Sequence, residues 1–115
     1  MASRSEKAAR AYTHRVIDVH DNPSQSRFEI DDDGKLAGFA QYVRRPGRIL
    51  FMHTEIDPAF EGRGLGSQLA AAALNATRAA GERVVPLCPF IGSFIERHPE
   101  YDDLVDHELM GILDA

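Results

Sequence analysis

Glycine alternates with other residues in the segment Glu-Gly-Arg-Gly-Leu-Gly at positions 61–66. Glycine has no side chain, so a ligand can approach the backbone closely. The first amide groups of a helix lack partners within the helix, and the helix dipole places partial positive charge there. Because a helical pattern begins at Leu65, the segment predicts a cradle for a phosphate group. Taken alone, the motif is also compatible with a turn that needs glycine only for packing.

The surroundings of this segment separate it from two common phosphate-binding motifs. No Gly-Lys-Ser/Thr follows the glycines, which excludes a P-loop. The glycine spacing differs from that of a dinucleotide-binding fingerprint, and hairpins precede the segment where such a fold has βαβ units.

The elements before residue 58 have the alternating pattern of strands. Asp33-Gly34 and Pro46-Gly47 predict two turns, and the acidic run from Asp31 to Asp33 is interpreted as turn chemistry. The predicted strands are 16–19, a strand around 28–30, 35–44 and 49–56. Arg44, Arg45 and Arg48 cluster at the second turn, where a solvated turn is favoured over a phosphate contact.

After Pro58 the apolar period changes to that of a helix, which Gly81 ends. The residues expected on its buried face are Leu65, Leu69, Ala72, Ala73, Ala76 and Ala80. A strand over 84–88 and a short helix over 90–97 follow. The order strand, helix, strand predicts a crossover that joins two parallel strands.

The glycine segment and three other stretches resemble the GNAT N-acetyltransferase superfamily, and within it a family of minimal members. Those stretches are His53-Thr54-Glu55, Val84 to Phe90 with its Pro-Leu-Cys-Pro-Phe, and His98-Pro99-Glu100-Tyr101. The resemblance implies an α+β fold in which a curved, mainly antiparallel sheet is splayed at a parallel pair, with a βαβ unit and flanking helices. It implies a domain over residues 15–101, between a flexible arm (1–14) and an acidic tail (102–115).

The resemblance also implies that the chain uses acetyl-CoA. The pyrophosphate is expected on the backbone amides of the glycine segment, and the pantetheine arm between the two splayed strands. The expected cofactor-binding residues are Ile56, Arg63, Gly64, Leu65, Gly66, Ser67, Cys88 and Phe90. Glu61 departs from the Gln or Arg that is usual there, so its carboxylate must point away from the phosphates.

The residues expected to carry the chemistry are Cys88, His53 and Glu55. Many superfamily members use a tyrosine to protonate the leaving thiolate, but Ile95 stands at that position. Cys88 is therefore expected near the CoA sulfur as a hydrogen-bond donor. An acetyl-cysteine intermediate and a small buried apolar residue are the alternatives.

His53 and Glu55 are two residues apart on a predicted strand, so they share one face of it. Histidine is a suitable base for an amine, and Glu55 can orient the histidine or hold a cationic substrate. A hydrogen-bonded strand histidine beside a solvated glutamate is the alternative interpretation.

Composition limits the remaining possibilities. Eighteen acidic against 13 basic residues give a net charge of −5, which argues against a nucleic-acid-binding protein. One cysteine excludes an internal disulfide, and His14, His20 and His107 lack metal-ligand spacing, so no metal is expected. With no membrane span or secretory signal we expect a cytoplasmic monomer that acetylates an amine on a small molecule, peptide or protein lysine. A CoA-binding module without catalysis and an interaction protein that docks through its tail are the alternatives.

Overall fold

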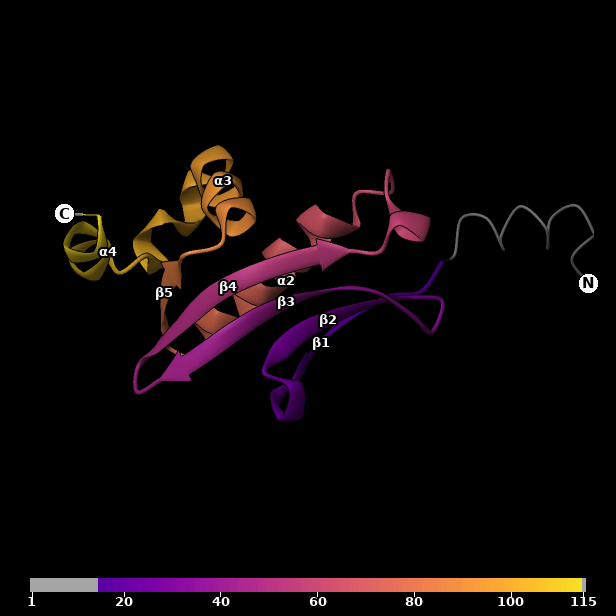
Figure 1. Cartoon of the computed structure of the whole chain (residues 1–115), viewed down its shortest axis with the longest axis horizontal. Coiled ribbons are helices and arrows are strands. Elements are labelled where there is room, and N and C mark those ends of the chain that lie inside the picture. Colours follow the sequence, from indigo (N-terminus) through magenta and orange to yellow (C-terminus); the bar gives the residue numbers. More distant parts are fainter. Residues whose placement is uncertain (1–14, 115) are drawn as a thin grey trace, which may run out of the picture.

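The computed structural model describes residues 15–114, so the expected flexible arm lies outside the described residues. One five-stranded sheet carries its strands in chain order (Figure 1). The strands are β1 (Ile17–Asn22), β2 (Arg27–Asp32), β3 (Lys35–Arg45), β4 (Arg48–Ile56) and β5 (Arg83–Pro86). The first four pair antiparallel, and β5 pairs parallel with β4.

The helices follow the predicted order, and the parallel pair is connected through α2. They are α2 (Leu65–Ala79), α3 (Pro89–Arg97) and α4 (His107–Leu113), with 3-10 turns at Pro23–Gln25, Pro58–Phe60 and Pro99–Leu104. Within residues 15–114, no helix has both the length and the apolar composition needed to cross a bilayer. The α+β fold with its βαβ unit and parallel pair is confirmed.

The core lies between α2 and one face of the sheet, to which β2, β3 and β4 contribute buried aromatic and aliphatic residues. The predicted buried face of α2 was wrong in part. Ala76 and Ala80 are exposed and Ala72 is only half-buried. The buried residues are Leu65, Leu69, Ala70, Ala73, Leu74 and Thr77. Turning the helix this way buries the larger Leu74, and the Thr77 hydroxyl is satisfied by donating to the Ala73 carbonyl at 2.8 Å.

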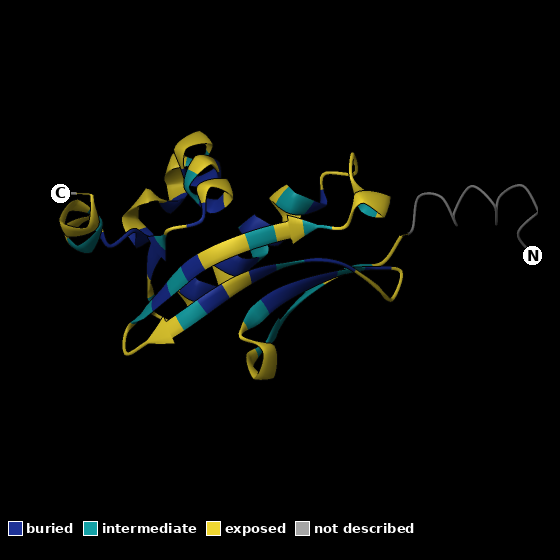
Figure 2. Ribbon diagram, in the orientation of Figure 1, coloured by how far each residue is buried: buried dark blue, intermediate teal, exposed yellow. Residues whose placement is uncertain are grey.

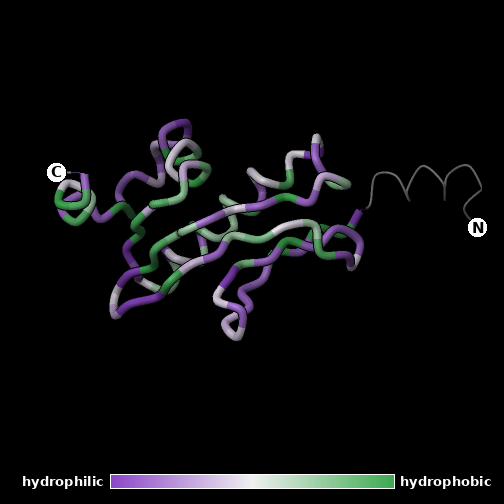
Figure 3. The backbone as a smooth tube through the Cα atoms, in the orientation of Figure 1, coloured by the Kyte–Doolittle hydropathy of each residue, from purple (hydrophilic) through white to green (hydrophobic). Residues whose placement is uncertain are grey.

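A β-bulge in β4 changes which face its side chains occupy. Tyr42 pairs with Phe51 and Gln41 pairs with His53, which leaves Met52 as an extra residue. Phe51 therefore faces the core, and two residues later His53 faces the opposite side of the sheet. Along β4, hydrophobic residues beside β5 give way to hydrophilic and exposed ones (Figures 2 and 3).

The expected boundary at residue 101 falls inside a packed segment, so the acidic tail does not start there as a separate piece. Leu104 and Val105 are buried, and Val105 forms a parallel bridge with Val84 on the free edge of β5. The Arg78 guanidinium binds the Asp103 carboxylate at 2.7 and 2.9 Å. The buried apolar side chains and the ion pair between Arg78 and Asp103 thus fix this segment to the rest of the fold. Helix α4, which has no buried residue, follows it.

The carboxylate of Asp32 ties the glycine segment to the sheet. Its side chain is 0% exposed and accepts from Arg15 Nε at 2.8 Å and from Arg63 Nη1 at 2.9 Å. Interpreting the run from Asp31 to Asp33 as turn chemistry was therefore wrong for Asp31 and Asp32, which lie in β2. Of the three, only Asp33 lies in the turn, with φ of +50°. The acid stays ionised because two guanidinium groups surround it, a partnership that the linear sequence does not show.

We predict that this carboxylate makes stability depend on acid pH. The hydrogen bond from Arg15, aided by the one from Arg63, holds the pKa of Asp32 below its ordinary value. A lowered folded-state pKa stabilises the fold above the unfolded pKa of about 4, and this stabilisation is lost as the pH falls through the folded value. Asp32→Asn should therefore lower the free energy of unfolding at pH 7, and the difference from wild type should shrink by pH 3.

Urea unfolding at the two pH values measures this difference. Asp33→Asn is the matched control, because Asp33 is exposed and its carboxylate accepts from the Val16 amide, a role that asparagine keeps. A destabilisation by Asp32→Asn that is equal at both pH values would contradict the assignment.

Candidate functional site

The parallel strands β4 and β5 part before β4 ends. Their last pair is Phe51 with Pro86, and the Cys88 amide then donates to the Phe51 carbonyl at 2.8 Å. The strand expected to run to Cys88 stops at Pro86, because the Leu87 amide turns back to donate to the Val85 carbonyl at 3.1 Å and Pro89 begins α3. Among the strands of residues 15–114, none pairs with residues 52–56 of β4 on the β5 side. This opening is the predicted splay.

The glycine segment lies at the end of β4 and opens α2. Gly62 and Gly64 have φ of +79° and +72°, a conformation that favours glycine. The first bond within the helix is donated by the Gln68 amide to the Gly64 carbonyl at 3.3 Å. Within residues 15–114, the amides of Leu65, Gly66 and Ser67 donate to no backbone carbonyl. Three unpaired donors therefore point outward from the start of α2.

These amides border a small open pocket of about 230 Å³, which we call the glycine pocket. It contains six of the eight residues expected to bind the cofactor, namely Ile56, Gly64, Leu65, Gly66, Ser67 and Phe90. Phe60, Glu61 and Gly62 complete the lining. The pocket is open and partly apolar, with free N–H donors at one end.

Gly66 has a packing role as well. A Cβ added at this position would lie 2.8 Å from Cζ of Phe90, so a larger residue would displace the Phe90 ring from the start of α2. The packing interpretation of the glycines is thus supported at Gly66, whereas the backbone conformation accounts for Gly62 and Gly64.

The side chain of Arg63 does not line the glycine pocket. It binds Asp32, and its guanidinium carbon lies 5.2 Å from the centre of the Phe60 ring. Arg63 therefore positions the loop, and its backbone is the part left to meet a ligand.

Cys88 also lies outside the glycine pocket, at the point where the strands part. It is 3% exposed, and its thiol donates to Oγ1 of Thr54 at 3.4 Å. The contact of Thr54 with Cys88 is a feature that sequence reasoning missed. The bulge at Met52, which has no sequence signature, puts the threonine on that side.

His53 and Glu55 lie together on the other face of β4. His53 Nε2 is 3.1 Å from Glu55 Oε1, and the two side chains are 55% and 60% exposed. The ring of Phe39 on β3 is 6.2 Å from the imidazole. The structure thus brings His53 and Glu55 together and separates them from Cys88 by the thickness of one strand.

A larger hollow of about 530 Å³ adjoins this face, and sequence reasoning missed it. Residues 36–39 and 54–58 line it, including Phe39, Glu55 and Asp57. It forms where the start of β3 meets the end of β4, and Gly38 leaves room there. Two acidic side chains and an aromatic ring are the features that suit a cationic group.

The remaining expectations concern residues away from these two hollows. Ile95 is buried, so an apolar core residue stands at the position where many superfamily members have the tyrosine acid. The Tyr101 hydroxyl donates to Asn75 Oδ1 at 3.0 Å on α2. Arg44 binds Glu82 and Asp21, and Arg48 is 3.7 Å from Asp106, so these arginines serve ion pairs within the fold.

Comparison with known proteins agrees with this architecture. Residues 27–104 match the profile of a family described as GCN5-related N-acetyl-transferase. A solved NMR structure of a Staphylococcus aureus protein, described as a GCN5-like candidate N-acetyltransferase, superposes with a TM-score of 0.59 over 76% of this chain and 86% of that one. Its sequence identity is 21%, so the likeness concerns the fold. No curated protein matches. Because the family profile matches more than half of the chain, the chain belongs to the GCN5-related N-acetyltransferase family.

Proposed function

We propose that this protein transfers the acetyl group of acetyl-CoA to a primary amine. The observation that carries the proposal is the set of unpaired amides at Leu65, Gly66 and Ser67, next to the free edge of β4. Amides at a helix start suit a pyrophosphate, and an unpaired strand edge suits the amide groups of pantetheine.

On the donor side, the diphosphate rests on the start of α2 and the pantetheine arm runs along residues 52–56. Ile56 and Phe90 give the arm an apolar wall in the glycine pocket. This path leads towards Cys88 and Thr54, where β4 and β5 separate. The thioester is thereby placed at the one point from which both faces of β4 can be reached.

On the acceptor side, the amine approaches over His53 and Glu55. Their face is exposed, and the larger hollow beside it carries Glu55 and Asp57. Carboxylates attract a protonated amine, and the histidine accepts a proton from it. We therefore assign the acceptor to cationic amines, whether small molecules, peptides or exposed lysines.

The transfer balances without further reagents. The protonated amine first loses a proton to His53, which releases it to solvent. The neutral nitrogen then bonds to the thioester carbonyl carbon, the carbon–sulfur bond breaks, and the second proton on nitrogen passes to His53 directly or through a water. CoA leaves as a thiolate that accepts a hydrogen bond from the Cys88 thiol. Holding the two reactants in line supplies much of the rate.

We predict that Gly64→Asp weakens CoA binding by about tenfold or more, which corresponds to about 1.4 kcal/mol. The new carboxylate would stand at the phosphate cradle and repel the diphosphate. Gly64→Asn is the matched control, because asparagine has the same shape, tolerates positive φ and adds no charge. Calorimetric titration with CoA measures both variants. Equal affinity of the aspartate and asparagine variants would contradict the placement of the phosphates.

Cys88→Ala should lower kcat by about tenfold to a hundredfold, because the free energy of a hydrogen bond to a charged group corresponds to a rate change of that size. The dissociation constant for CoA should change little, because Cys88 lies outside the glycine pocket. Cys88→Ser keeps a donor and should retain more of the activity. Unchanged kcat in Cys88→Ala would leave the residue with packing alone. An acetyl adduct on Cys88, found by mass spectrometry without an acceptor, would replace the donor role by a covalent one.

His53→Gln should lower kcat by about a hundredfold, as expected for removal of a general base, with unchanged CoA affinity. A steady-state assay over a panel of lysine peptides and small polyamines measures it. His107→Gln is the control, because His107 is also exposed beside a carboxylate, at 3.2 Å from Asp102. A loss of CoA affinity with normal turnover would contradict the assignment of His53 to the acceptor side.

Two other functions give different results in the same experiments. A CoA-binding module, suggested by Ile95 at the usual acid position, binds CoA without turnover of any amine. An interaction protein does not bind CoA, and loses its partner when residues 107–115 are removed.

A further inference from the structure

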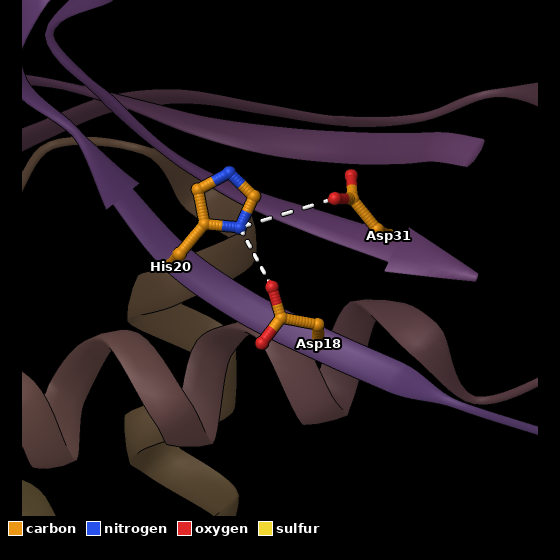
Figure 4. A group of neighbouring side chains, drawn as sticks. All are labelled: Asp18, His20 and Asp31. Carbon is orange, nitrogen blue, oxygen red and sulfur yellow. Dashed lines mark hydrogen bonds and ion pairs between the residues drawn. The ribbon is translucent and has the colours of Figure 1, made fainter. Parts of the chain in front are cut away.

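The exposed face of β1 and β2 holds a cluster that is separate from the glycine pocket. Asp18 and His20 on β1 and Asp31 on β2 place their ligand atoms within 4.8 Å of one another (Figure 4). His20 Nδ1 lies 2.9 Å from an oxygen of Asp18 and 3.9 Å from an oxygen of Asp31. In Figure 4 both carboxylates are directed at the same ring nitrogen. One imidazole and two carboxylates thus converge on a single point.

A fourth group orients the imidazole. The other ring nitrogen of His20, Nε2, is 3.1 Å from Oε1 of Glu29. Glu29 is buried, and its other oxygen accepts from Arg27 Nε at 2.7 Å and Asn22 Nδ2 at 3.1 Å, so its position is determined. A carboxylate that receives the Nε2 proton leaves the Nδ1 lone pair free to bind a metal, as metal-bound histidines in proteins generally require.

The charges of the cluster are unbalanced. Asp18 and Asp31 are direct cross-strand partners, an arrangement that is unfavourable for like charges. Among residues 15–114 neither makes an ion pair with a lysine or arginine, whereas nearby Glu29 and Asp32 are each held by arginine. Glu29 and Asp32 thus have arginine partners, whereas the basic group beside Asp18 and Asp31 is the His20 imidazole.

We infer that Asp18, His20 and Asp31 form a binding site for a divalent transition-metal ion of the Zn²⁺ type. Two ligands bound tetrahedrally at zinc distances lie about 3.4 Å apart, which is between the two distances measured from Nδ1. A nitrogen ligand favours Zn²⁺, Co²⁺ or Ni²⁺ over Mg²⁺. Three protein ligands leave a position for water, and the ion would tie the edge strand β1 to β2.

The test is a calorimetric titration of the full chain with ZnCl₂ alone, after the protein has been freed of metal by chelation. The absorption spectrum with CoCl₂ in place of ZnCl₂ reports the ligand geometry. Asp18→Asn, Asp31→Asn and His20→Gln should each weaken zinc binding by about tenfold or more, and Glu29→Gln by a similar factor through loss of orientation. MgCl₂ should give no comparable heat.

Two histidine variants serve as controls. His107→Gln removes another exposed imidazole next to a carboxylate, and His14→Gln removes the histidine outside the described residues. Both should bind zinc like wild type. Absence of zinc binding by wild type, or binding that survives His20→Gln and Asp18→Asn, would overturn the inference. CoA is not needed for any of these measurements, so the result is independent of the proposed acetyl transfer.

Discussion

The hydrogen-bonded ladder between β4 and β5 has to stop partway along β4, and the whole candidate site depends on this interruption. The ladder ends after Pro86 because the Leu87 amide turns back to the Val85 carbonyl, and the Cys88 amide adds one last bond to the Phe51 carbonyl before Pro89 starts α3. A continued strand would fill the free edge of β4 and would keep α3 away from the start of α2. The path of the backbone therefore creates the opening, and the side chains around it determine its chemistry.

The bulge at Met52 gives this opening two chemically different sides. Cys88 and Thr54 face the helices, while His53 and Glu55 face solvent. A thioester lying in the opening can be served by a thiol donor from one side and by a base and carboxylate from the other. In the proposed reaction, this division keeps the donor and the acceptor on different sides of β4 without additional domains. In the proposed reaction the acceptor side is exposed and acidic, whereas the donor side is an open, partly apolar pocket.

Much of the fold could be predicted from sequence because the signals were local. Turn residues at Asp33-Gly34 and Pro46-Gly47 delimit the hairpins, and the change of apolar period marks α2. Six of the eight expected cofactor residues line the glycine pocket, because a glycine-rich helix start is itself a local feature.

What could not be predicted depends on contacts between distant segments. The bulge at Met52 results from the pairing of two strands, and the burial of Asp32 depends on arginines from two other segments. Alanine fits either face of a helix, so the buried face of α2 is decided by Leu74 and Thr77. The cluster around His20 was missed for the same reason: its ligands are adjacent only after β1 pairs with β2.

The most direct test of the central claim is an NMR titration of the ¹⁵N-labelled chain with coenzyme A. The account predicts saturable shifts of the amide signals of Leu65, Gly66 and Ser67 and of residues 52–56, with little change on β1. Saturating coenzyme A that leaves the amides at the start of α2 unshifted would contradict it.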